Sequence, residues 1–371
     1  MKKTGILGGG QLGRMLLQQA ANYPIETYVM ENDAHCPAAH LCHHFTKGDI
    51  KDYDDVLNFG RQVDVLTIEI ENVNVDALFQ LEKEGVQIIP RPAVLKTIKN
   101  KILQKQLYEA HQIPTPAFVI TESRESLKQH DHIFPAVHKI GEGGYDGRGV
   151  QVLDSIAEID KGFEEQAILE KKVEIDKEIA LMVAVDQSGA IHFFPPVEMI
   201  FNPHLNQLDF QLCPANLQKE QLWKMEAIAV KLMKAFDSPG LFALELFIDR
   251  NGGIWVNETA PRVHNSGHHT IEGCTLSQFD CMLRVMLGYP VPEIEITSPS
   301  ALINWIGAPN YSGPAKYPQL AEVLKTANCF VHLYGKALSK PGRKMGHVTV
   351  LGSDRNDVVR KSKLIKAMLE S

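Results

Sequence analysis

Two glutamates near residue 250 are the first residues whose type and spacing suggest chemistry. Two apolar runs flank the Asn-Gly pair at 251–252, and such a pair between apolar runs predicts a β-hairpin. If this pair forms the turn, Leu246 pairs with Asn257 and Glu245 lies directly opposite Glu258. Like charges so placed destabilise a strand pair, and Mg²⁺ would compensate because it prefers one or two carboxylates together with nucleotide phosphates. A solvated hairpin with a different loop register is the alternative.

The ten residues after Glu258 form a polar loop with the sequence TAPRVHNSGH. Loops held by a rigid scaffold commonly carry functional side chains. Arg262 suits bidentate recognition of a carboxylate or phosphate, and His264 is able to move a proton near neutral pH. We therefore expect this loop, which also contains Asn265 and Ser266, to belong to an active site.

Two further segments have features of phosphate-binding sites. Five glycines between 141 and 149 follow a strand that ends in Lys139, and the backbone N–H groups of such a loop can approach phosphates closely. The basic residues Lys336, Arg343 and Lys344 lie in a segment that fits a phosphate monoester. A glycine-rich hairpin without a ligand and a solvated basic loop are the respective alternatives.

The first predicted helix follows the turn GGGQLG at 8–13, which matches the G-x-G-x-x-G pattern of dinucleotide-binding proteins. Glu31 ends the second predicted strand, about where an acid that binds ribose is expected. An NAD-dependent oxidoreductase is therefore one hypothesis. The physical content of the pattern is that a glycine-rich turn at a helix N-terminus either binds an anion or allows close packing.

The elements that must position these residues begin with an alternation of strands and helices. Such alternation predicts a parallel sheet with helices on both faces. A single long helix is expected over 93–111, with most of its lysines solvated, and the proline-containing segment 113–116 ends the first domain. The expected strands cover 4–7, 26–30, 63–70, 86–89, 135–139 and 167–173, with two or three more between 179 and 213, and the other expected helices cover 11–22, 53–60, 75–84, 219–236 and 276–287.

The composition restricts the classes of function. A net charge of −7 argues against nucleic-acid binding. No apolar span is long enough to cross a membrane, and the N-terminal segment lacks a signal-peptide cleavage site. The six cysteines form no CxxC pair, and the His- and Cys-rich tract at 35–44 fits no regular zinc spacing. We expect a cytoplasmic metabolic enzyme with reduced thiols.

Taken together, the chain resembles the N5-carboxyaminoimidazole ribonucleotide synthetase family of ATP-grasp enzymes. The resemblance rests on GILGGGQLGRM at 5–15, TIEIENV at 67–73, GGYDGRG at 143–149, NETAPRVHNSGH at 257–268 and KPGRKMGH at 340–347. It implies an α/β fold that is α+β in its ATP-grasp part. The implied domains are a Rossmann-like domain over 1–112, a lid subdomain over 113–175 and a C-terminal ATP-grasp domain over 176–371, with a small α/β portion from about 300. A homodimer is also implied.

The resemblance implies a binding site for ATP and Mg²⁺. Glu170 to Val173 would contact adenine through their backbone, Glu178 would bind the ribose, and Glu245 and Glu258, helped by Asn257, would carry Mg²⁺. The implied ATP-binding residues are Lys101, Lys139, Gly144, Tyr145, Asp146, Gly147, Arg148, Gly149, Glu170, Lys171, Lys172, Val173, Glu178, Asn257 and Glu258.

It further implies that 5-aminoimidazole ribonucleotide is carboxylated by bicarbonate at the expense of ATP, through carboxyphosphate, in purine biosynthesis. The implied catalytic residues are Arg262, His264 and Lys139. The implied substrate-binding residues are Gln11, Leu12, Glu71, Asn72, Tyr145, Asp146, Arg262, His264, Asn265, Ser266, Lys336, Arg343 and Lys344.

Two positions depart from the family pattern. The family usually has Arg where this chain has Lys101, which keeps the charge but loses the bidentate geometry of a guanidinium group. It usually has His where this chain has Phe201, so an imidazole contact to the nucleotide is expected to be absent. Rival functions are another ATP-grasp ligase that acts on a ribonucleotide or carboxylate, an NAD oxidoreductase, and a nucleotide-binding module without catalysis.

Overall fold

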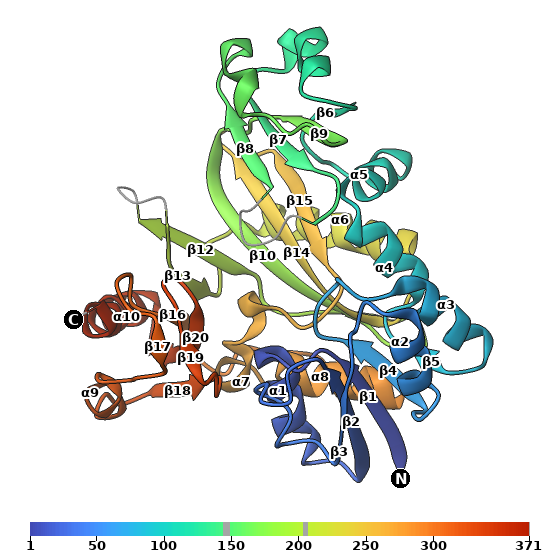
Figure 1. Ribbon diagram of the computed structural model, residues 1–371. Helices are drawn as coiled ribbons and strands as arrows, with labels where there is room; N and C mark the ends of the chain where they lie inside the picture. The colour runs from blue at the N-terminus through green and yellow to red at the C-terminus, as the bar shows by residue number, and fades with distance from the viewer. Residues whose placement is uncertain (144–148, 203–206, 371) are drawn as a thin grey trace.

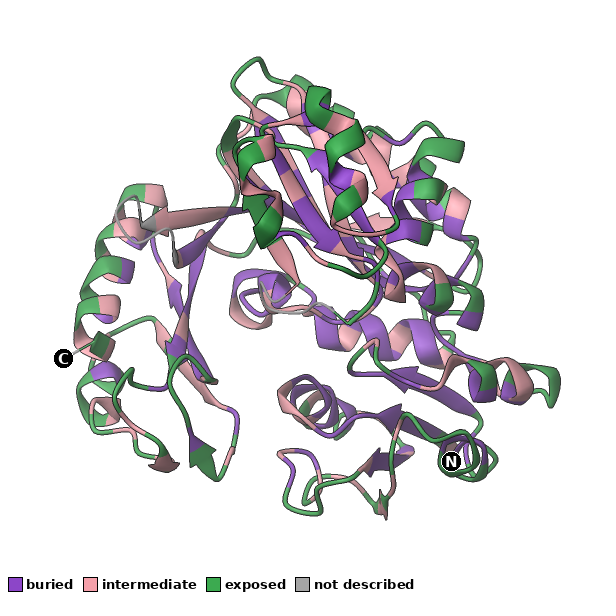
Figure 2. Ribbon diagram, turned by 45° about the horizontal axis from the view of Figure 1, so that its top comes forward, coloured by how far each residue is buried: buried purple, intermediate pink, exposed green. Residues whose placement is uncertain are grey.

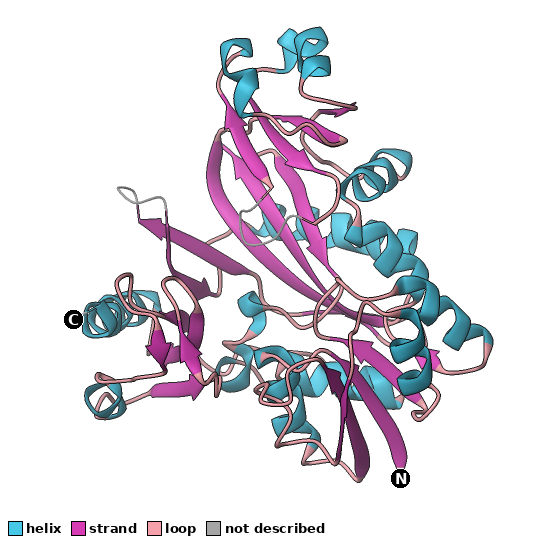
Figure 3. Cartoon of the chain, in the orientation of Figure 1, coloured by secondary structure: helices cyan, strands magenta, loops and turns pink. Residues whose placement is uncertain are grey.

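The computed structural model describes residues 1–143, 149–202 and 207–370 (Figure 1). Its described part has a mixed α/β architecture with a five-stranded, a four-stranded and a nine-stranded sheet, and one further two-stranded ribbon. Figure 3 shows helices lying beside each of the three larger sheets. No helix within the described ranges has the length and apolar character that crossing a bilayer requires.

The N-terminal sheet is parallel throughout, with strand order β3-β2-β1-β4-β5. The predicted alternation is confirmed, although β3 was missed because its sequence, HFTK, lacks an apolar pattern. Asp52 and Asn74 cap α2 and α3 by accepting from backbone N–H groups of the first turn. The elements are β1 (Lys2–Leu7), α1 (Gln11–Ala20), β2 (Ile25–Glu31), β3 (His44–Lys47), α2 (Tyr53–Gly60), β4 (Val65–Ile68), α3 (Val75–Lys83) and β5 (Gln87–Ile88).

The long helix expected over 93–111 is wrong, because two helices occupy this segment. Helix α4 (Pro92–Lys99) ends at Asn100, whose backbone is extended, and α5 (Lys101–Ala110) begins directly after it. The Asn100 side chain accepts from the backbone N–H groups of Ile102 and Leu103 at 2.9 and 3.1 Å. A residue that caps one helix cannot continue the preceding one, so the break places Lys101 at the first position of a new helix.

We expect Asn100→Ala to lower the free energy of unfolding by about 1 kcal/mol, because both N–H groups lose their acceptor. Urea denaturation measures the change. Asn58→Ala is the matched control, since Asn58 lies exposed within α2 and Ala has a higher helix propensity, so this variant should lose nothing. An equal loss in both variants would contradict the capping role.

The four-stranded antiparallel sheet has the order β6-β9-β7-β8 and rises above the rest of the molecule in Figure 1. Leu127, Ile133, Ala136, Leu153 and Leu169 form its own small core. The glycine-rich loop that joins β7 to β8 falls on 144–148, outside the described residues, so the assignments of Gly144, Tyr145, Asp146, Gly147 and Arg148 lie there as well. The elements are β6 (Phe118–Thr121), η1 (Glu125–Ile133), β7 (Ala136–Ile140), β8 (Val150–Leu153), η2 (Ile156–Lys161) and β9 (Ala167–Lys171).

His138 is completely buried in this sheet and is neutral in the folded protein. Its Nδ1 accepts from the Phe163 N–H at 3.2 Å, and its Nε2 lies 2.9 Å from the Thr121 hydroxyl. Burial lowers the pKa of His138 from 6.5 to about 4. Between these two pH values the unfolded chain binds a proton that the folded protein does not, so this group removes stability as the pH falls from 6.5 towards 4.

We expect His138→Gln to lose less stability between pH 7 and pH 5 than the wild type does, by about 1–2 kcal/mol. Urea denaturation at the two pH values measures the difference. His132→Gln, in an exposed position of the same subdomain, should keep the acid dependence of the wild type. An unchanged acid dependence in His138→Gln would show that another group causes it.

The nine-stranded sheet is the centre of the molecule and is antiparallel, with the order β15-β14-β10-β12-β13-β16-β20-β18 and with β11 paired to β10. Its strands are β10 (Ile175–Val185), β11 (Ile191–Phe193), β12 (Val197–Asn202), β13 (Gln207–Cys213), β14 (Gly240–Asp249), β15 (Ile254–Ala260), β16 (Ser300–Ile306), β18 (Cys329–Leu333) and β20 (Lys344–Leu351). The separate ribbon pairs β17 (Gly313–Pro314) with β19 (Leu338–Ser339).

The segments 179–185 of β10 and 240–244 of β14 are buried on both faces (Figure 2), which explains their continuous apolar sequences. Leu181 and Leu244 pack on the face covered by α6 (Lys219–Phe236), whose predicted limits are confirmed. Met182 and Ala243 pack on the opposite face, with α1 and α8 (Gln278–Leu287). The other helices of this region are η3 (Asn265–Gly267), α7 (Thr270–Gly273), α9 (Leu320–Leu324) and α10 (Arg355–Glu370).

Candidate active site

The hairpin of β14 and β15 brings Glu245 and Glu258 together, although by a different route from the one expected. The predicted two-residue turn is wrong: Ile248 pairs with Ile254, and the Asp249 N–H donates to the Gly253 carbonyl across a longer loop. Leu246 therefore pairs with Val256, and the expected pairing of Leu246 with Asn257 is wrong as well.

A β-bulge then restores the register. The pairing shifts by one residue between Leu246 and Glu245, so Asn257 is the extra residue of the bulge and Glu245 pairs with Glu258. Residues opposite each other in an antiparallel pair direct their side chains to the same face. The predicted pairing of the two glutamates is thus confirmed, because the longer turn and the bulge offset one another.

The two carboxylates repel each other and have opposite pKa shifts. Burial raises the pKa of Glu245, and the nearby charges of Glu258 and Glu178 raise it further. Burial also opposes ionisation of Glu258, but Lys101, whose Nζ lies 2.6 Å from Glu258 Oε2, lowers its pKa below the ordinary value. Glu258 is thus a stable anion beside a lysine, whereas ionisation of Glu245 is disfavoured and an added positive charge would favour it.

The fit of this pair to Mg²⁺ follows from the donor set. Two carboxylate groups from adjacent strands are the number that Mg²⁺ takes from a protein when nucleotide phosphates and waters complete its shell. Among the described residues, no group of three or more His, Cys, Asp or Glu side chains is arranged to hold a metal by itself. Ligands from outside these side chains, such as nucleotide phosphates and waters, would complete such a site.

Next to Glu258, three charged side chains form a buried cluster. Glu170, only 2% exposed, accepts from Lys139 at 2.8 Å and forms an ion pair with Lys105 at 3.0 Å. Lys139 also donates to the Asn257 side chain at 2.9 Å. These residues, with Lys101, Glu258, Gln104 and Ile168, line one small hollow between the four-stranded sheet and the hairpin.

Lys105 corrects one expectation. Its helix was expected to expose most of its lysines, yet Lys105 is 2% exposed and Lys99 and Lys101 are half-buried, so among these lysines the expectation holds for Lys96 alone. Burial lowers the pKa of Lys105 to about 8, while the Glu170 carboxylate favours its charged form. The sequence contains one signal that Lys105 lies at the site: residues 101 and 105 are one helical turn apart, so they share a face of the helix.

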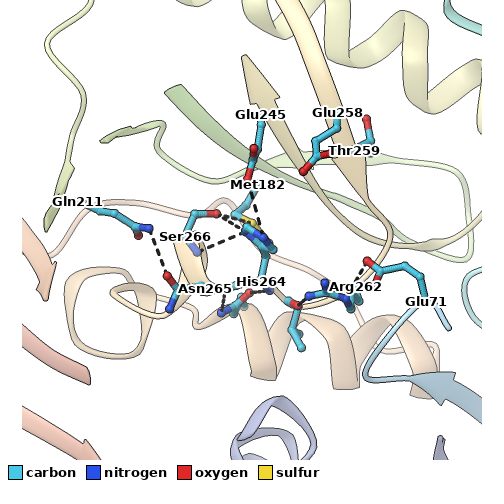
Figure 4. Close-up of polar contacts among 12 residues, drawn as sticks. Glu71, Met182, Gln211, Glu245, Glu258, Thr259, Arg262, His264, Asn265 and Ser266 are labelled. Atoms are coloured by element: carbon cyan, nitrogen blue, oxygen red, sulfur yellow. Dashed lines mark hydrogen bonds and ion pairs between the residues drawn. The ribbon is translucent and has the colours of Figure 1, made fainter. Parts of the chain in front are cut away.

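The polar loop after β15 lies below the two glutamates (Figure 4). Arg262 Nε lies 2.8 Å from Glu71 Oε1, which links this loop to the N-terminal domain. His264 Nε2 lies 4.0 Å from Glu245 Oε1, and His264 Nδ1 lies 2.9 Å from the Ser266 hydroxyl. Burial, with the charges of Arg262 and Lys344, lowers the pKa of His264 to about 3, so its imidazole is neutral near pH 7.

The remaining predicted residues lie around this centre. The Asn265 amide donates from Nδ2 to Asn304 Oδ1 at 3.0 Å and accepts at Oδ1 from Gln211 Nε2 at 3.3 Å. Lys336 donates to the Lys344 carbonyl at 2.7 Å, whereas Arg343 is exposed and donates to the Leu338 carbonyl. Glu178 lies in β10, where burial raises its pKa.

The other predicted residues lie at the ends of strands or on the surface. Lys171 and Lys172 are exposed at the end of β9, and Val173 after them is half-buried. Asn72 is exposed, Gly149 precedes β8, and Phe201 lies in β12.

The glycine-rich turn at 8–13 holds a carboxylate of the chain itself. Glu69, which the sequence analysis did not single out, accepts from the backbone N–H groups of Gly10 and of Leu12, the latter at 2.9 Å. Glu31 accepts from the Gly9 N–H at 3.1 Å. A β-carbon on Gly10 would lie 2.4 Å from the Glu69 carboxylate, so these glycines allow close packing. The anion position at the start of α1 is occupied, which argues against a dinucleotide there.

Comparison with known proteins agrees with this geometry. Residues 106–279 match the ATP-grasp domain family, residues 1–99 the ribonucleotide synthetase preATP-grasp domain, and residues 300–361 the phosphoribosylaminoimidazole carboxylase C-terminal domain. The N5-carboxyaminoimidazole ribonucleotide synthase of Synechococcus elongatus is 33% identical over 100% of this chain and 95% of its own length. The chain belongs to the N5-carboxyaminoimidazole ribonucleotide synthase family.

Solved structures of N5-carboxyaminoimidazole ribonucleotide synthases share the fold. The synthetase from Thermotoga maritima has a TM-score of 0.92 and 32% identity, covering 99% of this chain and 98% of that one. The synthase from Aspergillus clavatus in complex with ADP and 5-aminoimidazole ribonucleotide has a TM-score of 0.90 and 30% identity, covering 100% and 99%. A chloroplastic phosphoribosylaminoimidazole carboxylase from Vigna aconitifolia is 34% identical over 96% of this chain, which spans 65% of that protein's length.

Proposed function

We propose that this protein carboxylates 5-aminoimidazole ribonucleotide with bicarbonate and ATP, releasing ADP and phosphate, in de novo purine biosynthesis. The observation that carries the proposal is the pair of facing glutamates, Glu245 and Glu258, which lie between the lysines Lys101 and Lys139 and the polar loop of Arg262 and His264. On one side of this pair, the ammonium groups of Lys101 and Lys139 suit nucleotide phosphates. On the other side, Arg262 suits an anion and His264 suits an amine. The names of the family's members and the ribonucleotide complex of one relative support the substrate.

The lysines suit the phosphates of ATP. Lys101 and Lys139 point into the same hollow, held by Glu258 and Glu170, so phosphate oxygens can exchange with these carboxylates as partners. Stabilisation of a transferring phosphoryl group is mainly positioning and electrostatics, which fixed cations supply. Glu245 and Glu258 would hold Mg²⁺, which neutralises negative charge on the nucleotide when it is bound. Glu178 would accept from the ribose hydroxyls, and residues 170–173 would contact adenine.

The second half of the site suits bicarbonate and the aminoimidazole. Bicarbonate oxygen attacks the terminal phosphorus of ATP, the bond to ADP breaks, and carboxyphosphate forms. Carboxyphosphate then releases phosphate and CO₂, and the exocyclic amine bonds to the carbon and loses a proton. Arg262, held by Glu71, would anchor the anion. His264 would assist the proton transfer as a neutral hydrogen-bonding group, because burial lowers its pKa to about 3 and disfavours a charged ring, and the released phosphate is the stronger base for the proton. Exclusion of water by the glycine-rich lid would protect carboxyphosphate.

Two further features belong to the proposal. We expect a homodimer, which light scattering coupled to size-exclusion chromatography measures. We also expect a reducing, cytoplasmic compartment, since the six cysteines are unpaired and burial raises the pKa of the Cys274 and Cys281 thiols to about 12.

The deciding experiment is phosphate release from ATP with each substrate omitted in turn. Release that requires both 5-aminoimidazole ribonucleotide and bicarbonate supports the proposal. Release that needs bicarbonate and a different acceptor would assign another ATP-grasp ligase, and binding of ATP without turnover would assign a nucleotide-binding module.

A further inference from the structure

A row of buried side chains runs from the loop that carries His264 into the C-terminal strands. The buried row consists of Gln278, His268, His347 and Tyr334, each no more than 1% exposed. The reaction proposed above uses none of them. Burying four polar side chains costs stability unless each is hydrogen-bonded, so their arrangement calls for a reason.

Gln278 fastens both the backbone of His264 and the ring of His268. The His264 N–H donates to Gln278 Oε1 at 2.8 Å, which fixes the orientation of the amide. The amide nitrogen then donates to the His264 carbonyl and to His268 Nδ1, each at 2.8 Å. His268 Nδ1 is therefore an acceptor, so the neutral ring carries its proton on Nε2. A β-carbon on Gly267 would lie 2.6 Å from Gln278 Oε1, which explains the glycine between Ser266 and His268.

The row continues across rings into the C-terminal strands. The ring centres of His268 and His347 lie 4.9 Å apart, and the Tyr334 hydroxyl lies 3.0 Å from His347 Nδ1. His347 in β20 pairs with His332 in β18, and their stacked rings lie 4.5 Å apart. His332 in turn lies 2.7 Å from Glu272 of α7, so strand β18 is fastened to the same segment that follows the His264 loop.

The far end of the row fixes the basic residues expected at the phosphate. Tyr334 precedes Gly335, whose φ of 73° turns the chain towards Lys336. Lys336 Nζ lies 5.6 Å from the centre of the Tyr334 ring and donates to the Lys344 carbonyl at 2.7 Å. The buried row thus joins His264 at one end to Lys336 and Lys344 at the other.

We propose that Gln278, His268, His347 and Tyr334 are positioning residues that hold the two halves of the ribonucleotide site at a fixed separation. This inference rests on the proposed function, in which His264 faces the aminoimidazole half and Lys336 and Lys344 face the 5′-phosphate. A rigid ligand gains binding free energy from both halves of the site only if the distance between them matches the ligand. A small displacement of one half loses much of that binding free energy. The row is held by hydrogen bonds at its two ends, Gln278 to His268 and Tyr334 to His347, and by the packed rings of the two histidines between them, so it can act as a rigid spacer.

The test compares Tyr334→Phe and Gln278→Met, which keep side-chain size but break the row at its two ends. Tyr334→Phe removes one buried hydrogen bond and should raise the KM for 5-aminoimidazole ribonucleotide about tenfold. Gln278→Met removes the three side-chain hydrogen bonds to His264 and His268 and should raise this KM at least as much, and both variants should leave the KM for ATP within about twofold. The double variant should raise it little beyond Gln278→Met alone, because a row broken once no longer fixes the spacing.

Gln187→Met is the matched control. Gln187 donates to the Val285 and Met286 carbonyls at the other end of α8, so its loss should lower thermal stability without changing the KM for the ribonucleotide. An unchanged KM in Tyr334→Phe, additive effects in the double variant, or a parallel loss of ADP affinity measured by calorimetry would overturn the positioning role. If phosphate release by the wild-type protein does not depend on the ribonucleotide, the proposed function is wrong, and the role of the buried row is wrong with it.

Discussion

Replacing Glu258 by Gln is expected to reduce phosphate release from ATP by about 10²–10³-fold while the protein remains folded. The amide removes one of the two carboxylates that would hold Mg²⁺ and leaves Lys101, whose Nζ lies 2.6 Å from Glu258 Oε2, without its counter-charge. It also removes the charge that raises the pKa of Glu245, so that pKa should fall. Steady-state phosphate release with all substrates present measures the main effect, and circular dichroism checks the fold.

Glu174→Gln is the matched control for this variant. Glu174 pairs with Arg250 beside the same hairpin, at 3.7 Å, but its side chain is 79% exposed and far along the strands from Glu258. Exposed ion pairs contribute little to stability, and Glu174 lies away from the proposed metal site, so this variant should release phosphate at the wild-type rate. If Glu258→Gln turned over at a comparable rate, the facing glutamates would lose their assigned part in ATP chemistry.

Glu170→Gln is expected to lower the free energy of unfolding at pH 7 by about 3–5 kcal/mol. Glu170 is the carboxylate that faces both Lys105 and Lys139, whose side chains are 3% and 11% exposed. An amide keeps the volume but provides no counter-charge, so two lysines remain charged in a buried position. Urea denaturation measures the loss.

The sign of the pH dependence separates this explanation from a simple packing defect. Burial lowers the pKa of Lys105 from 10.5 to about 8 in the wild type, and loss of Glu170 lowers it further because the carboxylate favours the charged amine. Between the folded pKa and 10.5 the unfolded chain binds more protons, so stability rises with pH in that window. The deficit of Glu170→Gln should therefore be smaller at pH 9 than at pH 7. A deficit that is equal at both values would count against uncompensated lysine charge.

Glu84→Gln provides the comparison on the surface. Glu84 accepts from Arg61 through two hydrogen bonds of 2.8 Å, yet Arg61 is half exposed and water can replace the carboxylate. We expect this substitution to change the free energy of unfolding little, because solvent screens an exposed ion pair. The contrast between the two Glu→Gln variants measures what burial adds to an ion pair.

Much of the site could be predicted because its signals are local. The apolar runs around residues 251–252 indicate a hairpin, and the polar loop follows in the next ten residues. Helix α6 begins and ends where its apolar periodicity does. The motifs near Lys139, Glu258 and Lys344 identified the family, because short chemical patterns survive when most of the sequence has diverged.

The contacts that complete the site could not be predicted. Lys105 and Glu170 are 65 positions apart, Gly10 and Glu69 are 59 apart, and His264 is linked to His347 through Gln278 and His268. A sequence pattern gives the side of a helix or strand on which a residue lies, but not which distant segment packs there. Spatial neighbours of this kind require the tertiary fold.

The strand and helix pattern, the reversal of the chain near residue 251 and the residues able to do chemistry could be read from the amino-acid sequence, because these depend on neighbouring side chains and backbone preferences. The folded structure was needed to show that a longer turn and a bulge at Asn257 produce the pairing of Glu245 with Glu258, that Glu69 fills the glycine-rich turn, and that Lys105 is buried. The reason is that each of these depends on packing between segments that the chain brings together only when it folds.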